Sequence, residues 1–340
     1  MRTIRLLSFA AVLLFAVVLV FQPPCAGAAP VELTYSIFFP ATHGQCQAAM
    51  EWAREIERRT DGQVKITVFP GGTLTSPPQA YDGVVKGISD IGMSCFAYTR
   101  GRFPTMEAVD LPMGYVNGLQ ATRAANDFYR KLKPAELEDV QVMYLHAHGP
   151  GLLHTRKPVR TLEDLKGMKI RSTGLSAKIV EALGAVPVAK PQNETYENLQ
   201  KGVVEGTFGP IEVLKGWRQA EVIKSTTECE VVGYTTTMFV VMNRDKWDAL
   251  SADQKAVFQA VNEEFVDVHG RKWDEVDEAG RQYTLSLGNT IVPLAEDEKL
   301  RWQAAVKPII DDYIQEAAAN GLDGERIVET LRSAIAANPQ

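Results

Sequence analysis

The sequence predicts an α/β protein with two lobes that are connected by crossing strands and spanned by one long helix. Segments with the pattern of strands alternate with helical ones from Val31 onward, which is typical of α/β units with mainly parallel strand pairing. No segment rich in proline, glycine or serine divides the chain, so we expect several strands, rather than one linker, to join the lobes. The 340 residues, 45% hydrophobic and 23% charged, are enough for two cores.

The individual strands and helices follow from local periodicity. Val64–Phe69 alternates apolar and polar residues as a strand does, and Pro70-Gly71-Gly72 ends it. Cys46–Arg59 has apolar residues at helical spacing, and Pro77–Lys86 carries its prolines in the first turn, where a helix tolerates them. The remaining predicted strands are Val31–Phe38, Asp90–Met93, Val140–Leu145, Met168–Ile170, Val186–Val188 and Val204–Phe208, and the remaining short helices are Leu175–Leu183 and Tyr196–Gly202.

One proline-free segment, from Ser251 to about Leu287, is predicted to form a single long helix. A helix of about 37 residues is roughly 55 Å long, whereas a compact domain of half this chain is about 40 Å across. We therefore expect the helix to cross both lobes, with the polar Lys272 over the cleft. A coiled coil is the alternative, but leucine-rich heptads are lacking. The expected apolar stripe is Val257, Val261, Phe265, Val268, Val276, Ala279, Tyr283 and Leu287.

Residues 1–28 are predicted to be a secretory signal peptide. Two arginines precede an apolar run, Leu6–Phe21, and the small-x-small pattern Ala26-Gly27-Ala28 follows it. The run is short for a membrane anchor, which needs roughly 20 apolar residues. Cys25 raises the alternative of a lipoprotein, but a proline directly precedes it and no small-residue lipobox is present. We expect export with cleavage near Ala28.

Charge and cysteine content narrow the classes of protein further. The formal charge is −6 and no basic domain is present, so we expect no nucleic-acid partner. After cleavage three cysteines remain, Cys46, Cys95 and Cys229, and an odd number leaves at least one unpaired. Their spacing fits no metal-binding knuckle, and we expect no disulfide.

The sequence lacks the familiar catalytic and cofactor motifs. GxSxG, HExxH, P-loop and GxGxxG patterns are absent. His146 and His148 would share one face of a strand, but a metal site would need two more ligands, and nothing in the spacing selects His154 or Glu212. We interpret the pair as a strand edge near a crossover. We therefore expect no enzyme activity, no cofactor and no metal site.

The strongest local sign of a binding site is Arg171, at the end of a predicted strand. Ser172, Thr173 and Gly174 follow, and then a helix begins. A planar guanidinium beside the free N–H groups of a helix N-terminus is an arrangement that binds anions. The residues alone leave open the alternative of a surface arginine on an edge strand.

Three successive motifs resemble those of solute-binding proteins of tripartite ATP-independent periplasmic (TRAP) transporters, of the DctP type. They are FPGGTLTSPPQAYDGVVKGISDIGMS at Phe69–Ser94, RTLEDLKGMKIRSTG at Arg160–Gly174 and ETYENLQKGVVEGTFGP at Glu194–Pro210. The segment WDALSADQKAVF, Trp247–Phe258, is also typical of the family. The resemblance covers nearly the whole chain after the signal peptide.

The resemblance implies a periplasmic protein whose two α/β lobes face each other across a cleft. Lobe I would comprise residues 29–147 plus 235–270, and lobe II residues 148–234 plus 271–340. The resemblance further implies an organic carboxylate held by Arg171 and delivered to TRAP membrane permease subunits that are driven by an ion gradient.

The sequence departs from the sialic-acid branch of this family at three positions. Gly151 stands near the place of a second arginine, Cys95 near that of an acidic residue and Gly209 at that of an asparagine. Because a second carboxylate without a partner is costly to desolvate, we expect a monocarboxylate with an apolar body, aromatic or branched. The residues expected to bind it are Arg171, Phe38, Phe39, Cys95, Phe96, Tyr98, Gly151, Gly174, Gln192, Phe208, Gly209 and Trp217, with Tyr196 and Tyr234 as weaker candidates.

Two other classes of protein use a similar scaffold. One is the binding protein of an ABC-type importer or an extracytoplasmic sensor, and neighbouring genes for one small and one large membrane subunit would favour the TRAP interpretation over it. The other is a periplasmic enzyme, against which the missing catalytic residues argue.

Overall fold

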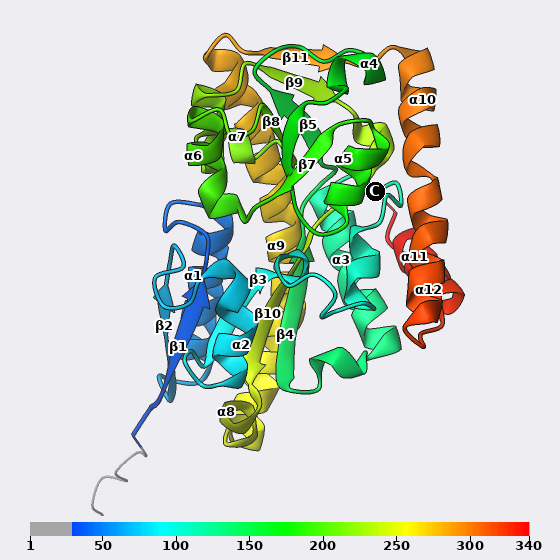
Figure 1. Cartoon of the computed structure of the whole chain (residues 1–340). Coiled ribbons are helices and arrows are strands. Elements are labelled where there is room, and N and C mark those ends of the chain that lie inside the picture. The colour runs from blue at the N-terminus through cyan, green and yellow to red at the C-terminus, as the bar shows by residue number, and fades with distance from the viewer. Residues whose placement is uncertain (1–28, 340) are drawn as a thin grey trace, which may run out of the picture.

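The computed structural model describes residues 29–339, which form two β-sheets, each with its own set of helices (Figure 1). The predicted signal peptide, residues 1–28, lies outside the described residues. The predicted α/β class is confirmed, and the predicted strands and helices are present with ends shifted by one to three residues.

The first sheet has the strand order β2-β1-β3-β10-β4. Its strands are β1 (Val31–Ile37), β2 (Val64–Phe69), β3 (Ile91–Cys95), β4 (Val140–Ala147) and β10 (Thr237–Asn243). The helices around this sheet are α1 (Gly44–Arg59), α2 (Ala80–Val85), α3 (Gly118–Leu132) and α8 (Arg244–Asp248). The predicted helix Pro77–Lys86 is divided, because a 3-10 turn at Pro77–Gln79 precedes α2.

The second sheet has the order β11-β9-β5-β8-β6-β7. Its strands are β5 (Leu152–Thr155), β6 (Lys169–Ser172), β7 (Val186–Ala189), β8 (Gly206–Gly209), β9 (Ser225–Glu228) and β11 (Thr290–Pro293). The short helices of this half are α4 (Leu162–Leu165), α5 (Ser176–Ala182), α6 (Thr195–Gln200) and α7 (Val213–Gly216). Figure 1 shows this sheet and its helices above the first one.

Strand direction differs in part from the predicted mainly parallel pairing. β1, β2 and β3 pair in parallel, as do β6, β7 and β8. However, β10 is antiparallel to both β3 and β4, and β5 is antiparallel to both β8 and β9. These two strands adjoin the segments that cross between the sheets, so they enter their sheets from the other half of the molecule instead of through a helix of the same sheet.

The long helix α9 (Ala252–Ser286) has 35 residues and extends from the first sheet to the second, as predicted. It starts with a capping box: Ser251 Oγ accepts from the backbone N–H of Gln254, and the Gln254 side chain accepts from the backbone N–H of Ser251. It contacts α1, α3 and β4 at one end and α7 and β11 at the other. The two lobes therefore share one continuous helix (Figure 1).

The buried face of α9 differs from the predicted apolar stripe. Val261 is buried as expected, but Leu287 is 44% exposed. Asn262 and His269 are buried instead; Asn262 Oδ1 accepts from Trp52 Nε1 at 2.9 Å, and both ring nitrogens of His269 have side-chain partners. Polar residues with buried partners can occupy a core face, and a search for apolar periodicity misses them. The predicted stripe members that are only half-buried are Val257, Val268, Val276, Ala279 and Tyr283.

One turn of α9 is anchored to both halves of the molecule. Asp274 Oδ1 accepts from the backbone N–H of Gly118 at 2.6 Å, at the start of α3. Three residues later, Asp277 Oδ1 accepts from the backbone N–H of Glu212 at 3.0 Å, just before α7. This part of α9 therefore lies where the two halves meet, and Lys272 borders a groove between them, as expected.

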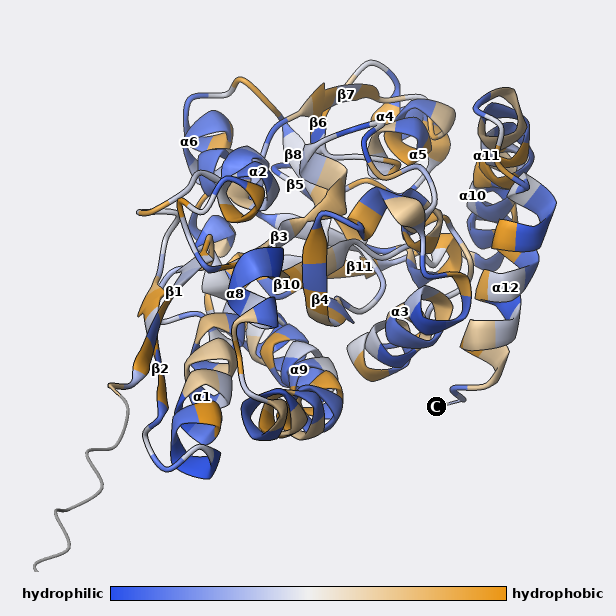
Figure 2. Cartoon of the chain, turned by 90° about the horizontal axis from the view of Figure 1, so that it is seen from below, coloured by the Kyte–Doolittle hydropathy of each residue, from blue (hydrophilic) through white to orange (hydrophobic). Residues whose placement is uncertain are grey.

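The C-terminal helices return from the second half to the first. α10 (Glu296–Val306) packs near α4 and α5, α11 (Pro308–Ala319) follows, and α12 (Gly324–Ala336) packs on α3 (Figure 1). Figure 2 shows hydrophobic and hydrophilic residues mixed along α1, α3 and α9, as expected for amphipathic helices that cover a sheet.

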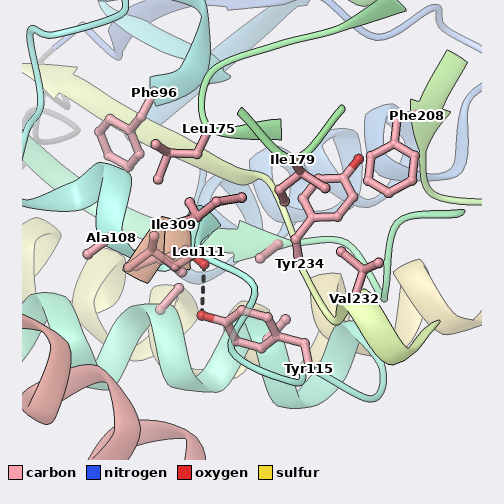
Figure 3. Packing of buried hydrophobic residues seen from close by; sticks show 14 of the residues in the cluster. Phe96, Ala108, Leu111, Tyr115, Leu175, Ile179, Phe208, Val232, Tyr234 and Ile309 are labelled. Carbon is pink, nitrogen blue, oxygen red and sulfur yellow. Dashed lines mark hydrogen bonds between the residues drawn. The ribbon is translucent and has the colours of Figure 1, made fainter. Parts of the chain in front are cut away.

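The core continues from the first half to the second through residues of the crossing segments. Tyr115 is buried, and its hydroxyl donates to the backbone oxygen of Val109 at 2.8 Å (Figure 3). Phe208 and Tyr234 stack with their ring centroids 4.8 Å apart, and Ile179 lies beside Tyr234 (Figure 3). Cys46, Cys95 and Cys229 are buried within the described chain and form no disulfide.

A buried carboxyl group makes the stability of the fold depend on pH. Asp110 is 3% exposed, and its Oδ1 accepts from the backbone N–H and the hydroxyl of Thr237. Burial raises the pKa of Asp110 well above its ordinary value. The native state therefore holds this proton at pH values where the unfolded chain has released it, so this group's contribution to stability decreases as the pH rises above about 4.

We expect Asp110→Asn to be more stable than the wild type at about pH 7, by about 1 kcal/mol or more, and to lose this advantage near pH 4. Denaturant unfolding at both pH values measures the difference. Asp164→Asn is the control with the opposite sign, because backbone N–H donors from Arg160 and Thr161 lower the pKa of Asp164. A destabilised Asp110→Asn protein at pH 7 would contradict this expectation.

Candidate ligand-binding site

A cavity lies between the two halves of the molecule, close to the crossing segments and to α9. The volume of this cavity is about 40 Å³. Both halves contribute to the walls, which consist of Phe38, Phe39, Cys95, Tyr98, His148, Arg171, Thr173, Gln192, Phe208, Gly209, Pro210, Glu212, Val213, Trp217, Tyr234, Thr236, Met238 and Trp273. The cavity is therefore small, mostly apolar and aromatic, with few polar groups.

Arg171 supplies the positive charge of the cavity. It lies on β6, between β7 and β8, and is 4% exposed. Its Nε donates to the backbone oxygen of Lys190 at 2.8 Å, which fixes the plane of the guanidinium. Within residues 29–339 the two terminal nitrogens have no hydrogen-bond partner and no carboxylate pairs with them. A buried guanidinium without an anion is costly, so this fork is suited to an anionic ligand.

Gln192 and Tyr98 lie at the same end of the cavity. The Tyr98 hydroxyl accepts from the backbone N–H of Gln192 at 3.1 Å, a bond that joins the first half to the second. The side-chain nitrogen of Gln192 is buried without a partner among the described residues. Burial raises the pKa of the Cys95 thiol above its ordinary value, so this wall of the cavity is neutral.

Aromatic rings form the side of the cavity. Phe38 stacks on Phe39 at 4.4 Å between ring centroids. Phe38 also contacts Tyr98, at 5.7 Å, and Trp217, at 6.1 Å, so it lies between them. The two phenylalanines follow β1 directly, and the end of that strand therefore delivers their rings to the cavity.

A second polar group is formed by Glu212 and His43. Glu212 Oε2 lies 2.8 Å from His43 Nε2, and both residues are 2% exposed. His43 Nδ1 accepts from the backbone N–H of Gln45 at the start of α1, so its Nε2 carries a proton and donates to Glu212. His43 belongs to the first half and Glu212 to the second, so this pair is a second contact that joins the halves.

His148 and Trp273 complete the wall near the crossing segments. Burial lowers the pKa of His148 to about 4, so its imidazole is neutral at neutral pH. Trp273 is buried on α9, and its Nε1 donates to His146 Nδ1 at 3.1 Å. Arg171 is thus the one fully charged cation among the lining residues that the structure describes.

Nine of the twelve residues expected to bind a ligand line this cavity. The three exceptions have other surroundings. Phe96 is in the core, 5.0 Å from the ring of Phe103. Gly151 faces Tyr234, whose ring lies 2.0 Å from where a Cβ of residue 151 would be. Gly174 faces Ala97 of the other half, and a Cβ at position 174 would lie 2.7 Å from the Cβ of Ala97. Of the weaker candidates, Tyr234 lines the cavity, whereas Tyr196 bonds to Glu221 away from it.

The sequence reasoning did not place His148, Glu212 and Trp273 in the site. The HxH spacing drew attention to His148, which we interpreted as part of a strand edge. His148 instead follows the last residue of β4 and lines the cavity. Trp273 directly follows Lys272, the residue expected over the cleft. This position in the sequence could have indicated that Trp273 lies near the site. Glu212 had no local signal, since its partner His43 is 169 residues away.

Two further observations concern metals and membranes. Within residues 29–339 no group of three or more histidine, cysteine, aspartate and glutamate side chains is arranged to hold a metal ion. In the same range no helix is both long enough and apolar enough to cross a membrane.

Comparisons with known proteins agree with this geometry. The profile of the bacterial extracellular solute-binding protein family 7 (DctP) matches residues 35–316. A TRAP periplasmic solute-binding protein from Bordetella bronchiseptica, solved with bound (R)- and (S)-mandelate, is 33% identical, with a TM-score of 0.84 over 91% of this chain and 99% of that one. A TRAP solute-binding protein from Rhodoferax ferrireducens, with copurified benzoate, is 28% identical, with a TM-score of 0.86 over 91% and 98%. The C4-dicarboxylate-binding periplasmic protein DctP of Vibrio cholerae is 22% identical over 87% of both chains.

Proposed function

The chain belongs to the bacterial extracellular solute-binding protein family 7, the DctP family of TRAP transporters, and we propose that its ligand is a small aromatic monocarboxylate. The protein is a TRAP solute-binding protein that takes up an organic carboxylate between its lobes. The buried, unpaired fork of Arg171 inside an aromatic cavity is the observation that carries the proposal.

In this proposal Arg171 binds the carboxylate through its two terminal nitrogens. Nε is already bonded to Lys190, so the guanidinium is oriented before the ligand arrives. The unpartnered amide nitrogen of Gln192 is a further donor for the same carboxylate. Charge-assisted hydrogen bonds of this two-pronged kind are strong and directional, which favours a carboxylate over a neutral group.

The rest of the ligand would lie against Phe38, Phe39, Phe208 and Trp217. The lining offers no second lysine or arginine, so a second carboxylate would be desolvated without a partner. The Bordetella and Rhodoferax proteins, which hold mandelate and benzoate, support an aromatic acid. The Vibrio relative, which is named for C4-dicarboxylates, represents the class that we expect this cavity to reject.

The proposal extends to transport. The protein would be exported by a signal peptide that is cleaved near Ala28, work in the periplasm and pass its ligand to TRAP permease subunits in the membrane. The lobes would be residues 29–147 plus 235–270 and residues 148–234 plus 271–340, which move about the crossing segments and α9. One departure from these bounds is α12, residues 324–336, which packs on α3 of the first lobe and which we therefore assign to that lobe.

A thermal-shift screen of organic acids, followed by calorimetry, tests the proposed ligand class. Benzoate, mandelate and related aromatic acids should raise the melting temperature of the mature chain, because a ligand that binds only the folded state stabilises it. Succinate and other C4-dicarboxylates should leave it unchanged. Binding of C4-dicarboxylates or sialic acid, with no response to any aromatic or branched monocarboxylate, would refute the proposal.

A further inference from the structure

Building on the proposed function, we propose that Glu212 and Trp217 form a second polar subsite that selects a ligand with a hydroxyl group at the end remote from its carboxylate. Both side chains line the cavity, and neither is a cation that could bind a carboxylate. The subsite would distinguish hydroxylated aromatic acids from plain ones and from dicarboxylates.

The position of the subsite follows from the order of the aromatic rings. Phe38 contacts both Tyr98, at 5.7 Å, and Trp217, at 6.1 Å, whereas no ring contact joins Tyr98 to Trp217 within residues 29–339. Tyr98 belongs to the end of the cavity with Gln192. Trp217 lies beside His43, at 5.9 Å between rings, and His43 in turn bonds to Glu212. Trp217 and Glu212 therefore both contact the imidazole of His43. Phe38 separates them from the end of the cavity where Tyr98 and Gln192 lie and where the carboxylate would bind.

Both groups have unused hydrogen-bonding capacity. Trp217 Nε1 is buried and has no acceptor among the described residues. Glu212 is 2% exposed; its Oε2 accepts from His43, whereas its Oε1 makes no hydrogen bond within residues 29–339. A buried indole N–H without a partner is costly, and Glu212 Oε1 is an acceptor that no described residue uses, so a ligand group that bonds to both gains affinity.

The outer side of this wall does not satisfy the indole N–H of Trp217. Glu212 and Trp217 also border a groove of about 670 Å³, together with His43 and Lys272. The indole nitrogen is nevertheless inaccessible from that groove, since it is buried. Lys272 pairs with Glu275 on the same helix and not with Glu212. For Trp217 the ligand side of the wall is therefore the side that can supply the missing partner, and Glu212 lines that side as well.

The chemistry of the pair identifies a hydroxyl group. Trp217 Nε1 only donates a hydrogen bond, and the ionised Glu212 only accepts one. A hydroxyl does both at once: its oxygen accepts from the indole and its proton is donated to the carboxylate. A ketone, an ether or a second carboxylate could serve Trp217 but not Glu212, and the second carboxylate would also be repelled by the Glu212 charge.

Calorimetry on the mature chain with five matched probes tests this inference. At least one of 3-hydroxybenzoate and 4-hydroxybenzoate should bind about tenfold or more tightly than benzoate, as a hydrogen bond to a charged group predicts. 3-Methoxybenzoate, which accepts but cannot donate, should show no such gain, and benzene-1,3-dicarboxylate should bind most weakly.

Three variants and one control test whether Glu212 and Trp217 cause the preference for a hydroxyl group. Glu212→Leu should bind benzoate but lose the preference for the hydroxyl, to within about threefold. Glu212→Gln, which keeps the shape and the bond to His43, should improve the binding of benzene-1,3-dicarboxylate relative to benzoate. Trp217→Phe keeps a ring and removes the donor, so it should reduce the preference as well. Glu275→Gln makes the same charge change in the outer groove and should leave every ratio unchanged.

Two results would overturn the inference. One is equal binding of benzoate and both hydroxybenzoates by the wild type, and the other is a hydroxyl preference that persists in both Glu212 variants. In either case the proposed function stands, because benzoate still binds. If no aromatic carboxylate binds the wild type at all, the proposed ligand class fails, and the hydroxyl subsite fails with it.

Discussion

Replacing Arg171 with alanine is expected to weaken binding of the aromatic acid by about 30-fold to several thousandfold. The variant would leave the carboxylate buried and unpaired in the cavity, which costs roughly 2–5 kcal/mol, and about 1.4 kcal/mol corresponds to one decade of affinity. Arg171 is 4% exposed and its terminal nitrogens have no partner among the described residues, so most of this loss should appear in binding and little in folding. Calorimetry with the tightest acid of the screen measures it.

Two further variants show whether the loss of affinity comes from the charge and planar shape of the Arg171 guanidinium or from a general effect of removing an arginine. Arg171→Lys should restore part of the affinity, because lysine keeps the charge but lacks the planar fork. Arg160→Ala removes an exposed arginine of the same motif and should matter far less. If Arg171→Ala remains folded and binds within about threefold of the wild type, the arginine is structural and the carboxylate site lies elsewhere.

Replacing Gly174 with valine is expected to block closure of the lobes and to reduce affinity by up to on the order of a hundredfold. A Cβ at Gly174 would lie 2.7 Å from the Cβ and 3.1 Å from the Cα of Ala97, which belongs to the opposite lobe. Since part of this clash involves backbone, it cannot be relieved by a change of rotamer. Overpacking of this kind costs roughly 1–3 kcal/mol, and this cost falls on the closed state. The strain of a valine at the positive φ of Gly174, 51°, is present in the open state as well.

X-ray scattering measures closure directly. The wild type should have a smaller radius of gyration at saturating ligand, because a ligand between the lobes favours the closed state through its contacts with both. Gly174→Val should not become more compact. Gly167→Val is the matched control, since Gly167 also has a positive φ, of 75°, but has open space around it. Normal compaction of Gly174→Val, or no compaction of the wild type, would contradict the closure mechanism.

The sequence predicted about half of the described strands and α-helices, those whose patterns are local. Val64–Phe69 has the alternation of a strand, and Ser251 begins α9 with a capping box that its own neighbours complete. α3 was not predicted: its buried residues include Ala121, Ala124 and Asn126, which give little hydrophobic contrast. β10 was not predicted as a strand either, and its antiparallel direction depends on the strands beside it and not on its own residues.

The binding site could be predicted only in part. Arg171, Gln192 and the aromatic residues at strand ends and turns were found, because a strand end or turn at the cleft is visible in the pattern. Phe96 and Tyr98 belong to the same 3-10 turn after β3, yet Phe96 enters the core and Tyr98 lines the cavity. A turn of this tightness sends side chains two residues apart in different directions, which sequence pattern does not resolve.

The sequence by itself determined the α/β class, the helix that spans both lobes, the resemblance to TRAP solute-binding proteins, which the family match confirms, and Arg171 as the residue suited to an anion. Each of these depends on neighbours within a few turns or on a motif of adjacent residues. The tertiary structure alone decided that Glu212 meets His43 and that Trp273 closes the cavity. These contacts join segments far apart in the chain, because the cavity forms only where two separately folded sheets meet, and no local pattern contains that geometry.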